Sequence, residues 1–462
     1  MDIVNENATF QHDDIFHRVD FAKKAMALIE SHPVERGACV LSIDAPWGMG
    51  KSTFLRMWKN ELDSYNQEET ACQEPFFTRA PNSCIYYNAW ENDYYENAFI
   101  PLLFTISGSL IIEKDEKEER EKKKRDLLRK VTSAGAGILG FMACASTTKN
   151  PELATGIGAL TTTAVDSFMQ MFDNSDLDVI GQQYEKEIAL RQEFSKAVAE
   201  LAETAGRLFI FVDELDRCKP LFAVQTLECI KHFFNIPNVV FVFATDISQL
   251  VHSVAGIYGE GMNAGGYLSK FFDYQLHLPV PEISDLLQYA YPRIAVGSGF
   301  YDIANEIREA FIVTPREMPI IINQAYALWN SLNLSVYVRD ISYEFSYFVC
   351  IFALKFKWPE QYTKLFHGTL EWRNRIDEKK FMTVYNFFTY TEKWVRKSSI
   401  ELNKELNKVD SEIMKKSSDQ NAVMTYDDEE MEWLYLLNNT CRNQHFGART
   451  IGEVLHTIFE VF

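Results

Sequence analysis

The residues best suited to chemistry lie in the segment ACVLSIDAPWGMGKSTFLRMW, residues 38–58. A loop with two glycines, a lysine and a serine stands between an apolar run and residues with helical spacing. Glycines let backbone N–H groups curl round a phosphate, Lys51 neutralises β- and γ-phosphate charge, and Ser52 offers a hydroxyl to Mg²⁺. The segment predicts a strand, a phosphate-binding loop and a helix whose positive end adds to the site.

The match to the strict phosphate-loop pattern is incomplete, because Ala45 stands where that pattern begins with glycine. The alternative is an ordinary glycine turn that carries Lys-Ser by chance. The strand before the loop and the helix after it favour the phosphate loop. We predict that the nucleotide contacts Trp47, Gly48, Met49, Gly50, Lys51, Ser52 and Thr53.

A second constellation is RLFIFVDELDRC, residues 207–218, an apolar run that ends in acidic residues. Continuous hydrophobicity is typical of a central parallel strand buried on both faces. Asp213 is suited to hold the Mg²⁺ shell through water, and Glu214 to orient and deprotonate an attacking water. Asp216 is explained at least as well by a helix cap. We expect Lys51 and Glu214 to lie at the tips of neighbouring strands and to face one pocket.

Two further polar positions have competing explanations. Thr245 or Asp246, at the tip of the apolar run 238–245, is placed to sense a γ-phosphate or an attacking water, and turn formation explains this polar residue nearly as well. Arg316, at the start of a helix opened by Pro315, would reach the γ-phosphate or form a surface salt bridge.

Composition excludes some classes of protein. A formal net charge of −19 opposes a general nucleic-acid surface, because phosphates would be repelled except at a local basic patch. The eight cysteines form no C-x-x-C pair, so neither a zinc site nor a disulfide framework is indicated. The polar N-terminal segment has no secretory pattern, so we expect a cytoplasmic protein.

The distribution of elements predicts three regions. Residues 1–285 would form an α/β core, with a helical insertion at about 107–190 and a glycine-rich loop at 256–266. Residues 286–335 would form a helical lid that carries Arg316, and residues 336–462 a C-terminal helical region.

The insertion contains a basic run followed by two arms of small apolar residues, together residues 122–165. Each arm is shorter than the ~20 apolar residues that span a bilayer, which favours a packed hairpin or an oligomer contact. The basic run would also suit contact with an anionic membrane, at the inner face.

These motifs together resemble the KAP family of P-loop NTPases. The resemblance rests on WGMGKS at 47–52, YNAW at 87–90, IFVDELDRC at 210–218, FVFATD at 241–246, GGYLSKFF at 265–272 and TPRE at 314–317. It implies an additional-strand P-loop fold with a mostly parallel sheet, ATP and Mg²⁺ as cofactors, Glu214 as the catalytic acid/base and Arg316 as a sensor or finger. It also implies a setting in phage or plasmid exclusion, and an insertion that often holds transmembrane helices, from which the short polar hairpin here departs.

Our hypothesis from the sequence is Mg²⁺-dependent hydrolysis of a nucleoside triphosphate, with ATP expected, that drives a conformational or assembly change in a homo-oligomer or with a protein partner. Lys51, Glu214 and Arg316 would act in catalysis, with Ser52 and Asp213 at the metal. One alternative is a nucleotide-switched scaffold with little turnover, and another is a membrane-associated NTPase. A metabolite kinase is disfavoured because no acceptor site is visible.

Overall fold

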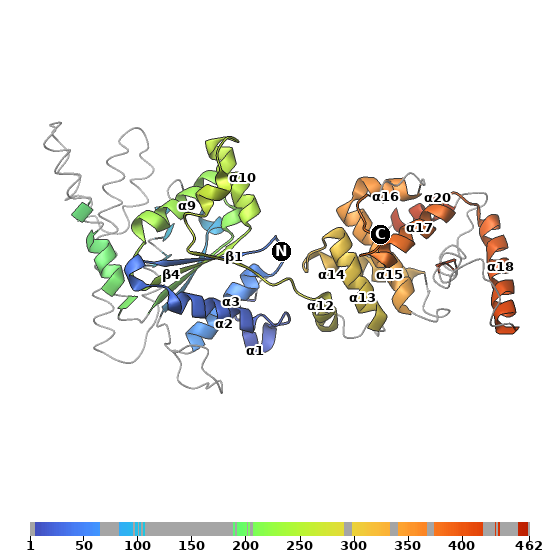
Figure 1. Cartoon of the computed structure of the whole chain (residues 1–462), viewed down its shortest axis with the longest axis horizontal. Coiled ribbons are helices and arrows are strands. Elements are labelled where there is room, and N and C mark those ends of the chain that lie inside the picture. The colour runs from blue at the N-terminus through green and yellow to red at the C-terminus, as the bar shows by residue number, and fades with distance from the viewer. Residues whose placement is uncertain are drawn as a thin grey trace. The chain divides into compact units, whose positions relative to one another are not determined.

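The structure is a computed structural model of the chain that divides into two compact units, residues 1–279 and 280–462, coloured by residue number in Figure 1. It describes residues 5–64, 83–95, 207–290, 298–332, 341–366, 374–418 and 451–460, with short stretches at 98–99, 101–102, 105–106, 188–189, 192–200, 202–203, 430 and 433–434. The basic run and the small-residue hairpin at 122–165 lie outside the described residues.

The first unit contains a five-stranded sheet in the order β2-β3-β4-β1-β5, with every pairing parallel. The strands are β1 (Cys39–Asp44), β2 (Ser83–Asn88), β3 (Leu208–Asp213), β4 (Val239–Thr245) and β5 (Tyr274–His277). The predicted α/β P-loop class with a parallel sheet is confirmed. The expectation of neighbouring strands for Lys51 and Glu214 is wrong, because the additional strand β4 lies between β1 and β3.

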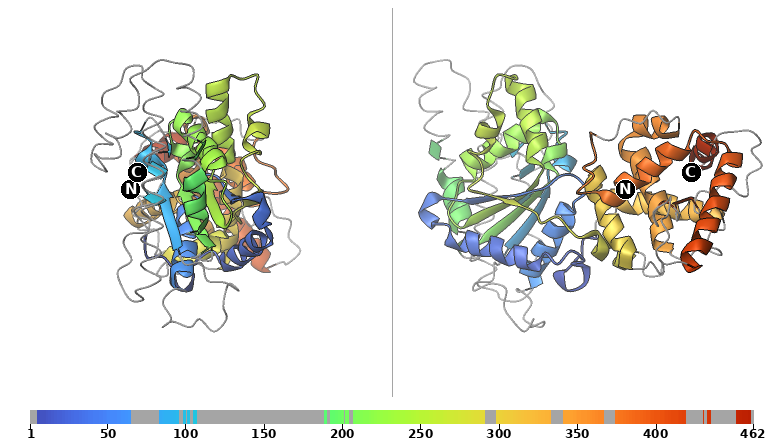
Figure 2. Two further views of the ribbon diagram at one scale, coloured as in Figure 1. Left: turned by 90° about the vertical axis from the view of Figure 1, so that its left-hand side faces the viewer. Right: turned by 45° about the vertical axis from the view of Figure 1, so that its right-hand side comes forward.

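Helices cover both faces of this sheet, as the views in Figure 2 show. Helices α2 (Val19–Ser31) and α3 (Lys51–Ser64) share one apolar cluster with alternate residues of the central strands. Helices α9 (Pro220–Phe233) and α10 (Ile247–Tyr258) share the opposite cluster with the intervening residues. Strands β3 and β4 are buried along their whole length, which explains their unbroken hydrophobicity.

The predicted loop at 256–266 is partly wrong. Helix α10 extends to Tyr258, and α11 (Ala264–Leu268) begins after Asn263, whose side chain accepts the N–H of Gly266 at 2.9 Å. Asparagine is a favoured N-cap because its oxygen satisfies an otherwise unpaired helix N–H group. The glycines of this segment therefore lie partly inside helices.

The described part of the second unit is helical. Its helices are α12 (Ile283–Ala290), α13 (Ser298–Phe311), α14 (Glu317–Ser331), α15 (Ile341–Lys357), α16 (Pro359–Phe366), α17 (Met382–Trp394), α18 (Ser399–Ser418) and α20 (Ile451–Glu460). The expected lid helices α13 and α14 both pack against α15, so the lid and C-terminal segments share one unit that begins at Val280. No described helix is both long enough and apolar enough to cross a bilayer.

Candidate functional site

The loop between β1 and α3 has the backbone that a phosphate-binding loop requires. Gly48 and Gly50 have φ angles of +82° and +83°, a region that residues with a Cβ rarely adopt. Between them Met49 is buried, which anchors the loop in the apolar cluster of α2 and α3. The N–H groups at the start of α3 have no intrahelical partners, because no helical turn precedes them, and they are suited to bind an anion.

Lys51, the first residue of α3, is buried. Its Nζ donates to the carbonyl oxygens of Ala45 at 2.5 Å and Pro46 at 3.3 Å, and lies 3.7 Å from Oδ2 of Asp216. The same Oδ2 accepts a 2.7 Å hydrogen bond from the indole Nε1–H of Trp47. Oδ2 of Asp216 thus contacts both Lys51 and Trp47 of the same loop.

Asp216 is therefore not the cap of α9, which begins after Lys219 without a side-chain cap. The short turn η3 (Leu215–Arg217) returns Asp216 to the carboxyl edge of the sheet. Sequence reasoning missed this role. The signal in the sequence is that Asp216, the third acidic residue, after Asp213 and Glu214, lies so close to the strand end that a turn can bring it back to that edge of the sheet.

Burial is the largest influence on the pKa values of Lys51 and Asp216. Desolvation lowers the pKa of Lys51, opposed chiefly by the charge of Asp216 and then by Asp246, Asp213 and Asp44. Desolvation raises the pKa of Asp216, opposed by Lys51 and by the Trp47 hydrogen bond. The positive charge of Lys51 thus depends on the carboxylates that surround it.

Asp213, the last residue of β3, is buried with 3% of its surface exposed. Its Oδ2 accepts the hydroxyl proton of Tyr86 from β2, and its Oδ1 accepts the N–H of Glu214 at 2.8 Å. The Arg56 guanidinium of α3 lies 3.3 Å from the centroid of the Tyr86 ring. Two strands and a helix therefore fix the orientation of this carboxylate.

Glu214 adopts a left-handed backbone conformation, with φ +59° and ψ +25°. For a residue with a Cβ this costs about 1–2 kcal/mol, and such strain is common at functional sites. Both carboxylate oxygens contact Nη1 of Arg217, at 3.0 Å and 3.2 Å. The Arg217 guanidinium lies 5.7 Å from the ring centroid of Trp90, which ends the YNAW motif.

The residues at the carboxyl end of β4 have structural partners. The Thr245 hydroxyl is 2.7 Å from that of Ser42 on β1, and Asp246 is the N-cap of α10. Asp44, at the end of β1, accepts the N–H of Ile247 at 2.8 Å. The cap agrees with the turn explanation of Asp246, whereas Thr245 makes a contact between strands, and a role of either residue in sensing the γ-phosphate stays a prediction.

The remaining predicted residues lie in two places. Ser52 and Thr53 are half-buried in the first turn of α3. Arg316 is exposed in the second unit, where Thr314 and Glu317 form a capping box at the start of α14. A contact of Arg316 with the phosphate loop stays a prediction.

A residue that sequence reasoning missed altogether is Arg18, which is 2% exposed and immediately precedes α2. Its Nη2 donates to the carbonyl oxygen of Pro279 at 3.0 Å. A Cβ built on Gly50 would lie 3.1 Å from its Nη1. No motif marked Arg18, because its partners are distant in sequence and one of them is a backbone group.

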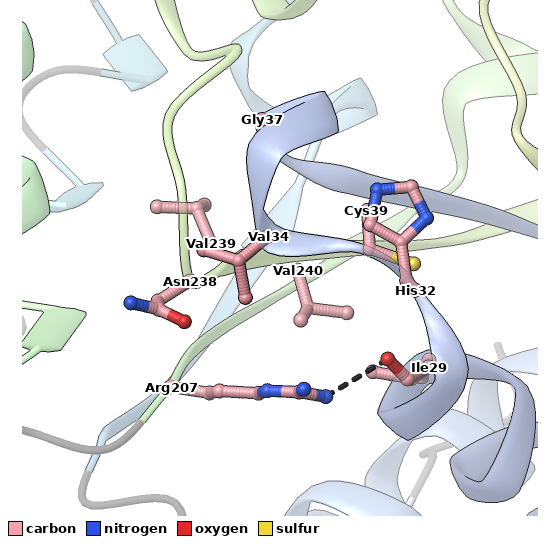
Figure 3. Close-up of a pocket in the computed structure, with 9 residues that line it drawn as sticks. All are labelled: Ile29, His32, Val34, Gly37, Cys39, Arg207, Asn238, Val239 and Val240. Atoms are coloured by element: carbon pink, nitrogen blue, oxygen red, sulfur yellow. Dashed lines mark hydrogen bonds between the residues drawn. The ribbon is translucent and has the colours of Figure 1, made fainter.

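A small pocket lies at the opposite, amino edge of the sheet (Figure 3). It is lined by residues before and at the start of the strands, among them His32, Cys39 and Val239. Arg207 crosses it and donates to the carbonyl oxygen of Ile29 at 2.9 Å. None of the predicted phosphate-binding residues lines this pocket.

The parallel sheet with β4 between β1 and β3, together with the glycine loop that opens α3, defines a P-loop NTPase fold. Residues 18–290, more than half of the chain, match the family model of the KAP family P-loop domain. The chain belongs to this family, whose members are nucleotide-binding P-loop NTPases. A comparison with curated proteins gave no match.

Proposed function

We propose that the first unit binds and hydrolyses a nucleoside triphosphate, with ATP expected, and that turnover drives a conformational or assembly change. The observation that carries the proposal is the buried Lys51 ammonium beside two positive-φ glycines at the start of a helix. Asp216 already pairs with this cation at 3.7 Å, and a phosphate held by the loop amides would add a second anionic partner.

The donor set at this edge fits Mg²⁺. The candidate ligands Ser52 and Asp213 both offer hard oxygen atoms, which Mg²⁺ prefers. Among the described residues, His, Cys, Asp and Glu form no group of three or more that could hold a metal ion by themselves. Mg²⁺ is usually held by one or two carboxylates together with waters and phosphates, so two protein ligands suffice. When bound, it would neutralise charge that develops on the phosphates.

In this proposal Glu214 is the general base that orients water and accepts its proton. Its strained backbone at the tip of β3 supports this role, because strain is retained where a side chain must be aimed. Lys51 would stabilise the transferred phosphoryl group, and Arg316 would report nucleotide state from the second unit.

A second candidate, a nucleotide switch with slow turnover, is favoured by the ion pair of Glu214 with Arg217. A carboxylate that has both oxygens in contact with a guanidinium must leave it before it can approach an attacking water. Hydrolysis would then wait for a partner or an assembly step that moves Arg217.

The test measures nucleotide binding and phosphate release with the full chain, as wild type and as Lys51→Met. The substitution keeps an unbranched side chain but removes the charge, so binding should weaken by about 100-fold, since hydrogen bonds to charged groups contribute about 1.5–3 kcal/mol. Lys23→Met, on the exposed surface of α2, is the matched control. Equal affinity in wild type and Lys51→Met would overturn the proposal.

Phosphate release separates the two candidates once binding is established. Steady turnover by the purified chain favours the hydrolase, and tight binding without turnover favours the switch.

A role in phage or plasmid exclusion is tested by the plating efficiency of phage on a host that carries wild type or Lys51→Met. Equal plating on both hosts would reject a nucleotide-dependent defence role.

A further inference from the structure

The Arg18 side chain is not needed for the start of α2. Its backbone N–H and that of Val19 already donate to the two carboxylate oxygens of Asp14, at 2.8 Å and 2.9 Å. The guanidinium instead extends into the interior, 5.0 Å from the ring centroid of Phe16. Within the described part of the chain its Nε has no hydrogen-bond partner.

A buried guanidinium is costly to maintain. Desolvation lowers the pKa of Arg18 to about 10, with the charge of Asp14 opposing the shift, so the side chain is still charged at neutral pH. A charged group that is desolvated and incompletely hydrogen-bonded needs a compensating role. Its position beside Gly50 and Pro279 indicates where that role lies.

Gly50 is the glycine immediately before Lys51, at a φ of +83°. Arg18 Nη1 and Phe16 lie on the side of Gly50 where a Cβ would project, at 3.1 Å and 3.9 Å from that position. The phosphate loop therefore rests on the Arg18 side chain. A shift of the loop backbone at Gly50 would displace the guanidinium.

Pro279 stands where the chain leaves the first unit. The N–H of Leu278 still donates to the carbonyl oxygen of Asp44 on β1 at 2.9 Å, and the second unit begins at Val280. Between these points the carbonyl group of Pro279 accepts Nη2 of Arg18 at 3.0 Å. Because Nη1 and Nη2 belong to one rigid plane, motion at one is transmitted to the other.

We propose that Arg18 is a positioning residue that couples the phosphate loop at Gly50 to the backbone of Pro279, so that nucleotide binding changes the chain where it enters the second unit. This inference rests on the proposed function only in requiring that nucleotide binds at the loop. It identifies a coupling element in the first unit, separate from any contact by Arg316.

The test is amide hydrogen exchange of the full chain, with and without saturating Mg²⁺ and a slowly hydrolysed ATP analogue. In wild type the analogue should change exchange over residues 280–290, which include α12, by about 5-fold or more, the lower end of typical coupling between sites. Arg18→Lys keeps the charge but loses the planar guanidinium with its two Nη groups. In this variant the change in exchange that the analogue causes at residues 280–290 should fall below about 2-fold. Equilibrium dialysis confirms that each protein is saturated.

Arg207→Lys is the matched control, because Arg207 also donates to a backbone carbonyl but does so at the amino edge of the sheet (Figure 3). It should keep the wild-type response. A saturated Arg18→Lys protein with the full response would overturn the coupling, as would a saturated wild type without any response at 280–290, a result that requires no variant to fold. Failure of wild type to bind the analogue in dialysis would instead overturn the proposed function, and the coupling with it.

Discussion

The two edges of the parallel sheet use polar side chains differently. At the amino edge, two charged side chains pair with single backbone groups: Arg207 donates to the carbonyl oxygen of Ile29, and Asp273 accepts the N–H of Val40 at 2.8 Å. At the carboxyl edge, Lys51, Asp213 and Asp216 are buried, and Lys51 and Asp216 contact each other.

The difference separates groups that stabilise the fold from groups that we propose act in nucleotide binding. A side chain that pairs a backbone N–H or C=O group adds a modest net stability. Buried charges are weak contributors to stability, because their desolvation offsets their attraction. The carboxyl edge therefore holds charges that folding alone would not favour, which is expected of a binding site. The amino edge supplies the control for the first prediction below and the variant of the last.

The largest expected effect is that of Glu214→Gln at the carboxyl edge. Removal of a general base should lower kcat for phosphate release by about 100-fold or more, while nucleotide affinity is retained because the phosphate loop is intact. Single-turnover and binding measurements separate the two quantities. Glu35→Gln, exposed near the amino edge, should change neither. Hydrolysis at the parental rate by Glu214→Gln would remove Glu214 from the mechanism.

Tyr86→Phe should have the next largest effect, because it removes the hydroxyl that holds Oδ2 of Asp213. Loss of a partner that orients a metal ligand typically weakens metal affinity by about 10–100-fold. The measurement is the Mg²⁺ concentration for half-maximal phosphate release. Tyr87→Phe is the control, because this neighbour lies on the other face of β2 and its buried hydroxyl has no hydrogen-bond partner among the described residues. Equal Mg²⁺ dependence in both variants would contradict the assignment of Asp213.

Asp216→Asn should shift the pH dependence of nucleotide binding. Binding requires the charged form of Lys51, so it is lost as pH rises through the lowered pKa of that lysine. Asp216 is the chief carboxylate that opposes the lowering, so its neutralisation should move the loss to lower pH. Asparagine can still accept the Trp47 indole hydrogen bond, so the effect isolates charge. If the pH midpoint for the loss of nucleotide binding does not move, or moves upward, the pairing of Asp216 with Lys51 is contradicted.

The smallest effect is expected at the amino edge, from Arg207→Met. Loss of the hydrogen bond to Ile29 should lower the free energy of unfolding by about 1 kcal/mol, with kcat and nucleotide affinity unchanged. Denaturant unfolding measures the free energy of unfolding, phosphate release measures kcat, and equilibrium dialysis measures nucleotide affinity. A large loss of turnover in a folded Arg207→Met protein would break the distinction between the edges.

Local sequence patterns predicted much of this molecule. The loop glycines and the flanking strand and helix were readable because each lies within a few residues of the next. The unbroken apolar runs of β3 and β4 likewise predicted central strands. The segment 256–266 is predicted poorly from its glycines, because helix α10 continues through Gly256 and the Asn263 cap allows α11 to include Gly265 and Gly266.

The sequence by itself determined the class of fold and the elements that carry the candidate site, since these depend on short-range periodicity and on the chemistry of single residues. Only the tertiary structure decided which charges meet. That β4 separates β1 from β3, that Asp216 pairs with Lys51 and that Arg18 joins Gly50 to Pro279 all depend on strand order and chain return. Such contacts join residues as many as 261 positions apart, and no local spacing rule encodes them.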